Sequence, residues 1–275
     1  MEIIGFLTAI LIGIILGILG GGGSILSMPI LVYIFHLEPT TATVYSLFII
    51  GVSSLIGVIP KYNQGHVHLK TAILFGSPAL ISVFLTRSFL IPSIPDEILS
   101  LSSFVLTKAI LTMAIFALLM IAASFSMIRK SIDSSTQINN IKITNYFSII
   151  IQGLLLGLLT GFVGAGGGFL IIPALVFRCK LPMKIAIGTS LLIIAANSII
   201  GFLGDLFISS EIINWKLLII FTSLAITGIF IGNYLTKFID STKLKKGFGW
   251  FILIMGIFII IKELKLFRTL LYFLE

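Results

Sequence analysis

Long apolar stretches follow one another along almost the whole chain, and they restrict its fold more than any other sequence feature. A helix that crosses a lipid bilayer needs about 20 predominantly apolar residues. The 275 residues are 58% hydrophobic and only 10% charged, with a mean hydropathy of +1.20. Ordinary soluble domains carry about 25% charged residues. The chain is therefore expected to be an all-α polytopic membrane protein, which excludes a soluble enzyme, a nucleic-acid binder and a disordered chain.

Ten apolar segments are separated by polar loops or by glycine runs. They cover residues 3–19, 24–35, 41–59, 69–91, 104–128, 146–163, 169–177, 185–203, 215–238 and 248–261. Two of them, 24–35 and 169–177, are too short to cross a bilayer alone, so the expected number of membrane segments is 8–10. The tail after residue 261 is short and amphipathic, and it is expected to lie at the membrane surface.

The sequence also contains an internal duplication. A shift of 144 residues aligns GILGGGGSILSMPILV (17–32) with GFVGAGGGFLIIPALV (161–176) without a gap. The glycines coincide, and so do Pro29 and Pro173, for which we expect a structural role. Chance matches between apolar segments would not align these residue types. The chain is accordingly divided into a first repeat at 1–128, a linker at 129–145 and a second repeat at 146–275.

The distribution of charge predicts how the repeats lie in the membrane. Most of the basic residues behind the net charge of +8 fall in four loops, at 60–70, 129–145, 178–184 and 237–246. If each repeat has five membrane segments, these loops share one side, and the acidic residues Asp96, Glu97, Asp205 and Glu211 fall in loops on the other. Basic loops stay in the cytoplasm. The pattern favours inverted repeats with a cytoplasmic linker and both termini outside.

Each glycine run interrupts an apolar segment at the same place in its repeat. Such a break frees backbone N–H and C=O groups, which a membrane tolerates only inside protein or beside a cavity. A short helix is expected to begin at Ser24 or Gly168, and its N-terminus favours an anion. We therefore expect substrate binding at Gly20, Gly21, Gly22, Gly23, Ser24, Gly164, Gly166, Gly167 and Gly168. The glycines spaced by four are more typical of close helix packing, namely Gly13, Gly17, Gly153, Gly157 and Gly161.

Polar side chains inside the segments 41–59 and 185–203 are the second set of candidates. Ser46, Thr189, Ser190 and Asn197 are expected to line a substrate cavity. The alternative is that serine and threonine hydroxyls bond carbonyls of their own helix. The amide of Asn197 needs more hydrogen-bond partners than carbonyls of its own helix would supply.

Charged and metal-binding side chains contribute little to the predicted site. No acidic residue is expected well inside a segment, and Arg87 and Lys108 are expected to extend their charged ends to the membrane surface. The single cysteine and the three histidines form no metal-ligand pattern. Neither a metal nor a cofactor is expected.

The paired runs GILGGGGSILSMP and GFVGAGGGFLIIP, together with AIGTSL at 186–191 of the second repeat, resemble the TauE/SafE family of sulfite exporters (the TSUP permeases). The resemblance extends over nearly the whole chain, with both halves in order. The first repeat departs from it modestly, because Val44 and Tyr45 stand where the second repeat has Gly188 and Thr189. The resemblance implies a multi-pass permease of the plasma (cell inner) membrane for sulfite, sulfoacetate or other sulfonates.

The sequence therefore favours a secondary transporter for small anions. A membrane-embedded enzyme would need a buried nucleophile, paired carboxylates or a metal cluster, and no such pattern stands in the sequence. The alternative is a membrane subunit that has a structural or partner-stabilising role and no transport of its own. The expected partners are a small anionic solute, the lipid bilayer and a coupling ion such as a proton or sodium, without nucleic acid.

Overall fold

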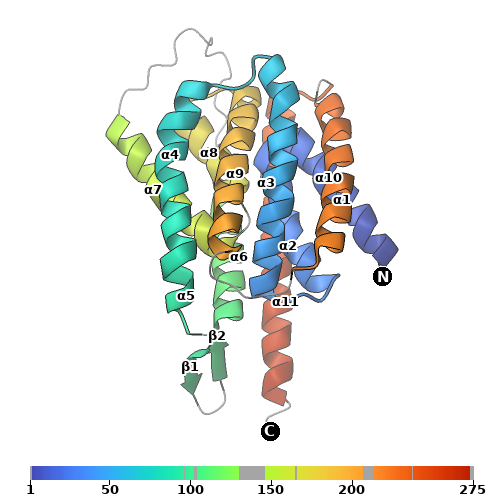
Figure 1. Cartoon of the computed structure of the whole chain (residues 1–275), viewed down its shortest axis with the longest axis vertical. Helices are drawn as coiled ribbons and strands as arrows, with labels where there is room; N and C mark the ends of the chain where they lie inside the picture. The colour runs from blue at the N-terminus through green and yellow to red at the C-terminus, as the bar shows by residue number, and fades with distance from the viewer. Residues whose placement is uncertain are drawn as a thin grey trace.

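The computed structural model describes residues 2–95, 97–101, 104–129, 146–164, 166–206, 213–236 and 238–272, and these are almost entirely helical (Figure 1). The first repeat comprises α1 (Glu2–Leu19), η1 (Gly20–Gly23), α2 (Ser24–Tyr33), α3 (Pro39–Asn63), α4 (Leu69–Leu85), η2 (Thr86–Leu90), α5 (Ile91–Ser93), β1 (Glu97–Leu101), β2 (Phe104–Thr107) and α6 (Lys108–Arg129). The second comprises α7 (Tyr146–Val163), α8 (Gly168–Phe177), α9 (Met183–Leu206), α10 (Trp215–Leu235) and α11 (Ser241–Tyr272). Within the predicted linker, residues 130–145 lie outside the described residues, as do Asp96 and Glu211.

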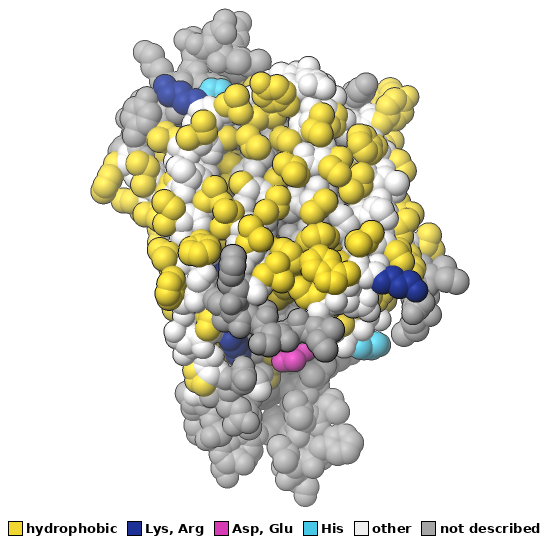
Figure 2. Space-filling model, in the orientation of Figure 1, with side chains coloured by type: hydrophobic (Ala, Val, Ile, Leu, Met, Phe, Trp, Pro, Cys, Tyr) yellow, Lys and Arg dark blue, Asp and Glu magenta, His cyan; other side chains and the backbone are white. Residues whose placement is uncertain are grey.

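The helices confirm an all-α polytopic membrane protein. Five of them are long and apolar enough to cross a membrane: Pro39–Asn63, Leu69–Ser93, Lys108–Phe125, Met183–Leu206 and Trp215–Leu235. Four shorter apolar helices accompany them, two of which are the short helices expected after the glycine runs. Figure 2 shows hydrophobic side chains across the middle of one face, with the coloured charged and histidine side chains towards its two ends. This distribution is what a lipid-facing surface requires.

One local prediction is wrong. The apolar segment expected to begin at residue 104 is helical only from Lys108, because Phe104–Thr107 pairs as an antiparallel strand with Glu97–Leu101. β-branched and aromatic residues at 104–107 suit a strand. The helix α11 continues without interruption through the predicted surface tail to Tyr272, and the place of that tail at the membrane surface stays a prediction.

Corresponding helices of the two repeats pack against one another. The first helix of each repeat lies on the fourth helix of the other, giving the pairs α1–α10 and α7–α4. The third helices, α3 and α9, pack together, and so do the fifth, α6 and α11. Such interlocking is compatible with inverted repeats, and the inverted relation itself stays a prediction.

Small residues make the α1–α10 and α4–α7 pairs close, as the spacing by four predicts. A Cβ placed on Gly13 or Gly17 would overlap the backbone of α10. A Cβ on Gly153 or Gly157 would likewise overlap the backbone of α4. These contacts confirm close helix packing as the role of the spaced glycines.

Candidate functional site

The two glycine runs meet inside the protein. The first forms the single turn η1 and leads into α2 at Ser24, and the second leads into α8 at Gly168. The backbones of Gly21 and Gly168 touch, so that a Cβ on either residue would overlap the other. Gly20, Gly164, Gly166 and Gly167 have φ values of +64° to +71°, which side-chain-bearing residues rarely adopt. Glycine is thus required both by the conformation and by the contact.

Each break also lies against the third helix of the other repeat. The Gly164 carbonyl accepts a hydrogen bond of 2.5 Å from the Ser46 hydroxyl of α3. In the corresponding place, a Cβ on Gly20 would lie 3.1 Å from the hydroxyl oxygen of Ser190 on α9. The structure therefore brings four predicted residues together in two equivalent pairs, Ser46 with Gly164 and Ser190 with Gly20.

The other predicted polar residues have different surroundings. The Ser24 hydroxyl donates to the Gly21 carbonyl at 2.6 Å, and the Thr189 hydroxyl accepts from the His68 N–H at 3.0 Å. Asn197 is 2% exposed, and both polar atoms of its amide lack a hydrogen-bond partner among the described residues. Pro29 and Pro173 are buried inside the short helices α2 and α8. Asn197 thus has the unsatisfied bonding capacity that a cavity-lining residue needs.

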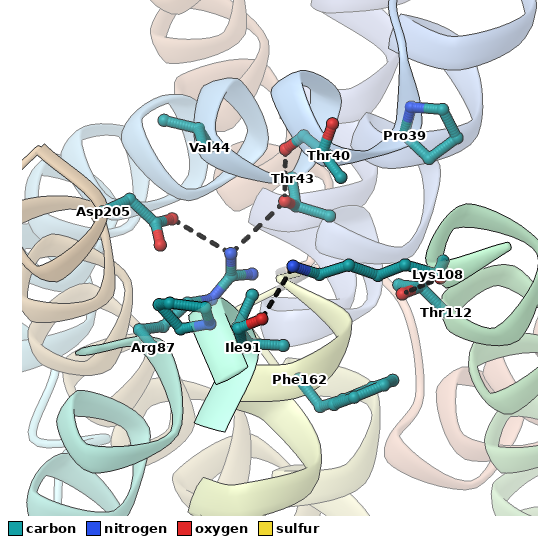
Figure 3. Close-up of a pocket in the computed structure, with 11 residues that line it drawn as sticks. Pro39, Thr40, Thr43, Val44, Arg87, Ile91, Lys108, Thr112, Phe162 and Asp205 are labelled. Atoms are coloured by element: carbon teal, nitrogen blue, oxygen red, sulfur yellow. Dashed lines mark hydrogen bonds and ion pairs between the residues drawn. The ribbon is translucent and has the colours of Figure 1, made fainter. Parts of the chain in front are cut away.

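A cavity of about 190 Å³ lies between the start of α3, the segment formed by η2 and α5, and the start of α6 (Figure 3). We call it the Arg87 cavity. Its lining residues are Pro39, Thr40, Thr43, Val44, Arg87, Ile91, Pro92, Lys108, Thr112, Phe162 and Asp205. At about 30 Å³ per molecule of liquid water, this volume holds roughly six waters, enough for a small oxyanion.

Arg87 is the central charged group of this cavity, and its predicted extension to the membrane surface is wrong. It is 3% exposed, and its Nη1 donates to Asp205 Oδ2 at 3.0 Å and to the Thr43 hydroxyl at 3.3 Å. Its Nε and Nη2 have no hydrogen-bond partner in the described part of the chain. The turn before α5 is a π-helix, Thr86–Leu90, an irregularity that is frequent at functional sites.

Asp205 is also not where the sequence placed it. Instead of lying in an outer loop, it belongs to α9, which continues to Leu206, and it is buried against Arg87. Because an isolated buried charge is costly, the two side chains are held in the interior as an ion pair. Asp205 therefore lies at the end of α9 rather than well inside it, but it is buried in the protein instead of exposed in an outer loop.

Lys108 adds a second positive charge to the Arg87 cavity. Its ammonium group points across the cavity and donates to the Ile91 carbonyl at 2.7 Å (Figure 3). Of the residues that line the cavity, two are cationic and one is anionic. Their charges sum to one positive charge, which a monovalent anion would neutralise.

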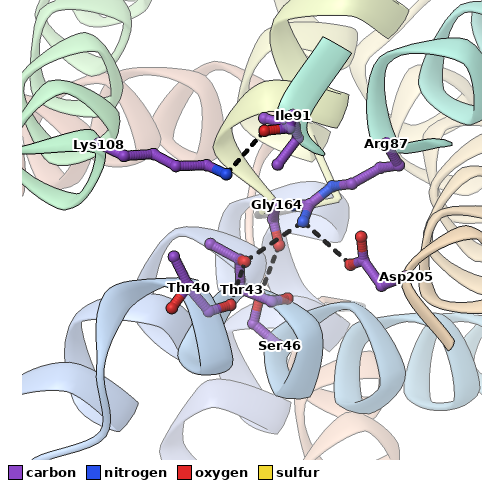
Figure 4. A network of polar contacts seen from close by, with 8 residues as sticks. All are labelled: Thr40, Thr43, Ser46, Arg87, Ile91, Lys108, Gly164 and Asp205. Atoms are coloured by element: carbon purple, nitrogen blue, oxygen red, sulfur yellow. Dashed lines mark hydrogen bonds and ion pairs between the residues drawn. The ribbon is translucent and has the colours of Figure 1, made fainter. Parts of the chain in front are cut away.

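The Arg87 cavity adjoins the second glycine break, as Figure 4 shows. A Cβ on Gly164 would overlap Nη2 of Arg87 and the side chain of Thr43. Ser46, one turn of α3 after Thr43, holds the Gly164 carbonyl. A glycine at this position is therefore what allows the guanidinium group to reach the broken backbone.

The sequence did not predict the ion pair of Arg87 with Asp205, because each residue stands near the end of an apolar segment, where charged side chains usually reach water. One signal was available in the sequence. Asp205 follows the apolar segment 185–203 by only two residues, so extending the helix by less than one turn includes it. Only the tertiary contact, however, joins it to Arg87, which lies 118 residues earlier.

Comparison with known proteins points to one family. The family model described as sulfite exporter TauE/SafE matches residues 5–259. A probable membrane transporter protein of Xylella fastidiosa (strain Temecula1) is 30% identical over 253 residues, which are 91% of each chain. The probable membrane transporter protein YdhB of Bacillus subtilis is 27% identical over 239 residues, which are 87% of this chain and 92% of that protein. No solved structure matches the chain.

Proposed function

The chain belongs to the sulfite exporter TauE/SafE family, and from that premise we propose that this membrane permease carries small anions that bind at Arg87. The proposed substrates are sulfur-containing anions such as sulfite, sulfoacetate or other sulfonates. The proposed location is the plasma membrane, with the 129–145 linker in the cytoplasm and both termini outside. Transport by the chain itself, coupled to an ion such as a proton or sodium, is part of the proposal.

The observation that carries the proposal is the free bonding capacity of a buried arginine. Two nitrogen atoms of the Arg87 side chain, Nε and Nη2, have no acceptor among the described residues, although the side chain is buried. Leaving such donors unsatisfied costs free energy. The planar guanidinium group offers them as a fork that fits two oxygens of one oxyanion. A sulfite or sulfonate group presents oxygens in that arrangement.

The glycine breaks are proposed to continue the path from the Arg87 cavity into the protein. Gly164 lies directly beside the guanidinium group, and the backbone from Gly166 to Gly168 leads into the N-terminus of α8. A helix N-terminus favours negative charge. The first break, at Gly20–Gly23, touches the second, so the two form one region with Ser46 and Ser190. Asn197 remains a candidate because its amide is unsatisfied within the described structure.

The proposal is tested by flux into proteoliposomes that contain this chain alone. We expect counterflow of sulfite or sulfoacetate, and the double variant Arg87→Gln/Asp205→Asn should reduce it at least about tenfold, since a charged hydrogen bond contributes about 1.5–3 kcal/mol. The double substitution avoids leaving Asp205 buried without its partner. The matched control is Arg178→Gln, which removes an exposed arginine.

Two results would decide against the proposal. If the folded double variant transports at the rate of the unmodified protein, Arg87 does not bind the anion. If the unmodified chain inserts and folds but shows no flux with sulfite, sulfonates or a panel of carboxylates, a subunit without transport of its own becomes the better interpretation.

A further inference from the structure

A second, smaller cavity lies at the opposite end of α3 from the Arg87 cavity. Its volume is about 60 Å³, and its lining residues are Lys61, Gln64, His66, Lys184, Ile187 and Thr236. We call it the Lys61 cavity. In Figure 1 the turn that joins α3 to α4 lies at the upper end of the view, and α5 lies towards the lower end. The two cavities are therefore separated by the length of α3.

The two cavities occupy corresponding places in the two repeats. The shift of 144 residues that aligns the glycine runs places Lys61 on Asp205, Thr40 on Lys184 and Thr43 on Ile187. Asp205, Thr40 and Thr43 line the Arg87 cavity, and the residues aligned with them, Lys61, Lys184 and Ile187, line the Lys61 cavity. The correspondence uses three of the six residues around the Lys61 cavity. The duplication has thus placed a cavity at the same end of each third helix, with different side chains.

Lys61 is buried without a carboxylate. It is 4% exposed, and its Nζ donates to the Thr236 hydroxyl at 3.1 Å. Asp205 pairs with Arg87, and the residues that line the Lys61 cavity include no carboxylate. An ammonium group has three N–H donors, and among the described residues one hydrogen bond, to Thr236, uses them. A buried ammonium group in this state either loses its proton or is stabilised by an anion from outside the protein.

The neighbouring groups make the cavity more positive. Lys184 lines the same space, and no acidic residue is among the lining residues. His66 has its pKa lowered by burial and then by the positive charges of Lys61 and Lys184. At neutral pH the imidazole is therefore uncharged and keeps one ring nitrogen as a donor. The ammonium groups of Lys61 and Lys184, with no carboxylate among the described lining residues, thus face a neutral hydrogen-bonding side chain.

We infer that the Lys61 cavity is a second binding site for a small oxyanion, at which Lys61 and Lys184 balance the anion's charge and Thr236 holds Lys61. One part of this inference, the class of ligand, rests on the proposed function. The cavity has room for about two waters at roughly 30 Å³ each, against about six for the Arg87 cavity. The Lys61 cavity is therefore the smaller of the two sites.

Binding is tested separately from transport, with purified protein in detergent and sulfite or sulfoacetate as the probe. The measured quantity is the rise in unfolding temperature with anion concentration, at constant ionic strength set with chloride. We expect the rise to persist in Arg87→Gln/Asp205→Asn, because the Lys61 cavity still binds. Adding Lys61→Gln should weaken the remaining affinity at least about tenfold, since it removes a charged hydrogen bond. Adding Lys180→Gln instead, which replaces an exposed lysine four residues before Lys184, should leave the remaining affinity unchanged.

A second measurement does not depend on the stability of the variants. The anion should slow chemical modification of the Lys61 amine in the unmodified protein and leave the rate at Lys180 unchanged, as read by mass spectrometry. The inference is overturned if Arg87→Gln/Asp205→Asn loses every anion-dependent rise, or if Lys61→Gln leaves that rise intact. Failure of the proposed function is distinct from both, because the unmodified protein would then show no flux while keeping an anion-dependent rise that Lys61→Gln weakens.

Discussion

The Arg87 cavity and the Lys61 cavity differ in how the protein balances their positive charge. At corresponding positions of the two repeats, one holds the carboxylate of Asp205 and the other holds the ammonium group of Lys61. The carboxylate pairs with Arg87 inside the protein, whereas no described carboxylate pairs with Lys61. The duplication has therefore kept the cavity and changed its charge. If both cavities bind the anion as proposed, the Asp205 carboxylate competes with it in the Arg87 cavity, whereas the Lys61 cavity depends on it for charge balance.

The largest difference between the cavities is expected in stability. Arg87→Gln should lower the free energy of unfolding by about 3–5 kcal/mol, because it removes the cation of a buried ion pair with Asp205. Lys61→Gln breaks no ion pair among the described residues, and it removes a buried charge while Gln still bonds Thr236. We expect that variant to be as stable as the unmodified protein or more so. Denaturant unfolding in detergent measures both.

The contrast between the two cavities is contradicted if Lys61→Gln lowers the free energy of unfolding as much as Arg87→Gln does. That outcome would mean that Lys61 has a strong partner within the protein. Recovery of stability in Arg87→Gln/Asp205→Asn is the control, since it removes both members of the pair.

The backbone beside the two cavities offers a second contrast. Gly65, next to the Lys61 cavity, has φ +71°, and no described atom lies within 4 Å of a Cβ placed there. Gly167, in the break beside the Arg87 cavity, has φ +69°, but a Cβ would overlap Thr160. Replacing either with Ala costs roughly 1–2 kcal/mol for the left-handed conformation. Gly167→Ala should cost about 1–3 kcal/mol more from overpacking, and it should reduce anion flux.

Equal effects of the two alanine variants on stability and flux would show that packing of the second break does not matter for transport. Because both glycines have nearly the same φ, the difference between the variants isolates the contact with Thr160. Unfolding and proteoliposome flux, measured on the same preparations, provide the comparison.

The sequence predicted those parts of the site that the internal duplication makes recognisable. Glycines aligned at the same shift located the two breaks, and the short helices begin at Ser24 and Gly168 as expected. The spacing by four located the close helix pairs. In both cases glycine is required by the local backbone or by a neighbouring one, so the residue type alone carries the information.

The charged residues were missed because their role depends on tertiary structure. Arg87 stands near the end of its apolar segment, where a long side chain would ordinarily reach water. A π-helical turn and the extension of α9 to Leu206 bring it to Asp205 instead. The hairpin at 97–107 was missed for a related reason, since a short apolar run fits a strand as well as a helix. The burial of Lys61 likewise depends on a tertiary contact, its hydrogen bond with Thr236, which lies 175 residues later.

The smallest expected difference between the cavities concerns pH. His66 faces the Lys61 cavity, and burial together with Lys61 and Lys184 lowers its pKa below the ordinary 6.5. The unfolded chain therefore takes up a proton on this residue before the folded protein does. Its contribution to stability is fully present above pH 6.5 and is lost as the pH falls towards the lowered pKa. His66→Gln should reduce this acid sensitivity, measured as the change in unfolding temperature between pH 7.5 and 5.5.

An anion in the Lys61 cavity should act in the same direction as His66→Gln. By balancing Lys61 and Lys184, it removes part of the repulsion that opposes protonation of His66, so sulfoacetate should lessen the acid sensitivity of the unmodified protein. The exposed His36 provides the control, because His36→Gln should leave that sensitivity unchanged. If sulfoacetate protects His66→Gln against acid as strongly as it protects the unmodified protein, the anion is not sensed at His66. The pH dependence would then give no support for an anion between Lys61 and Lys184.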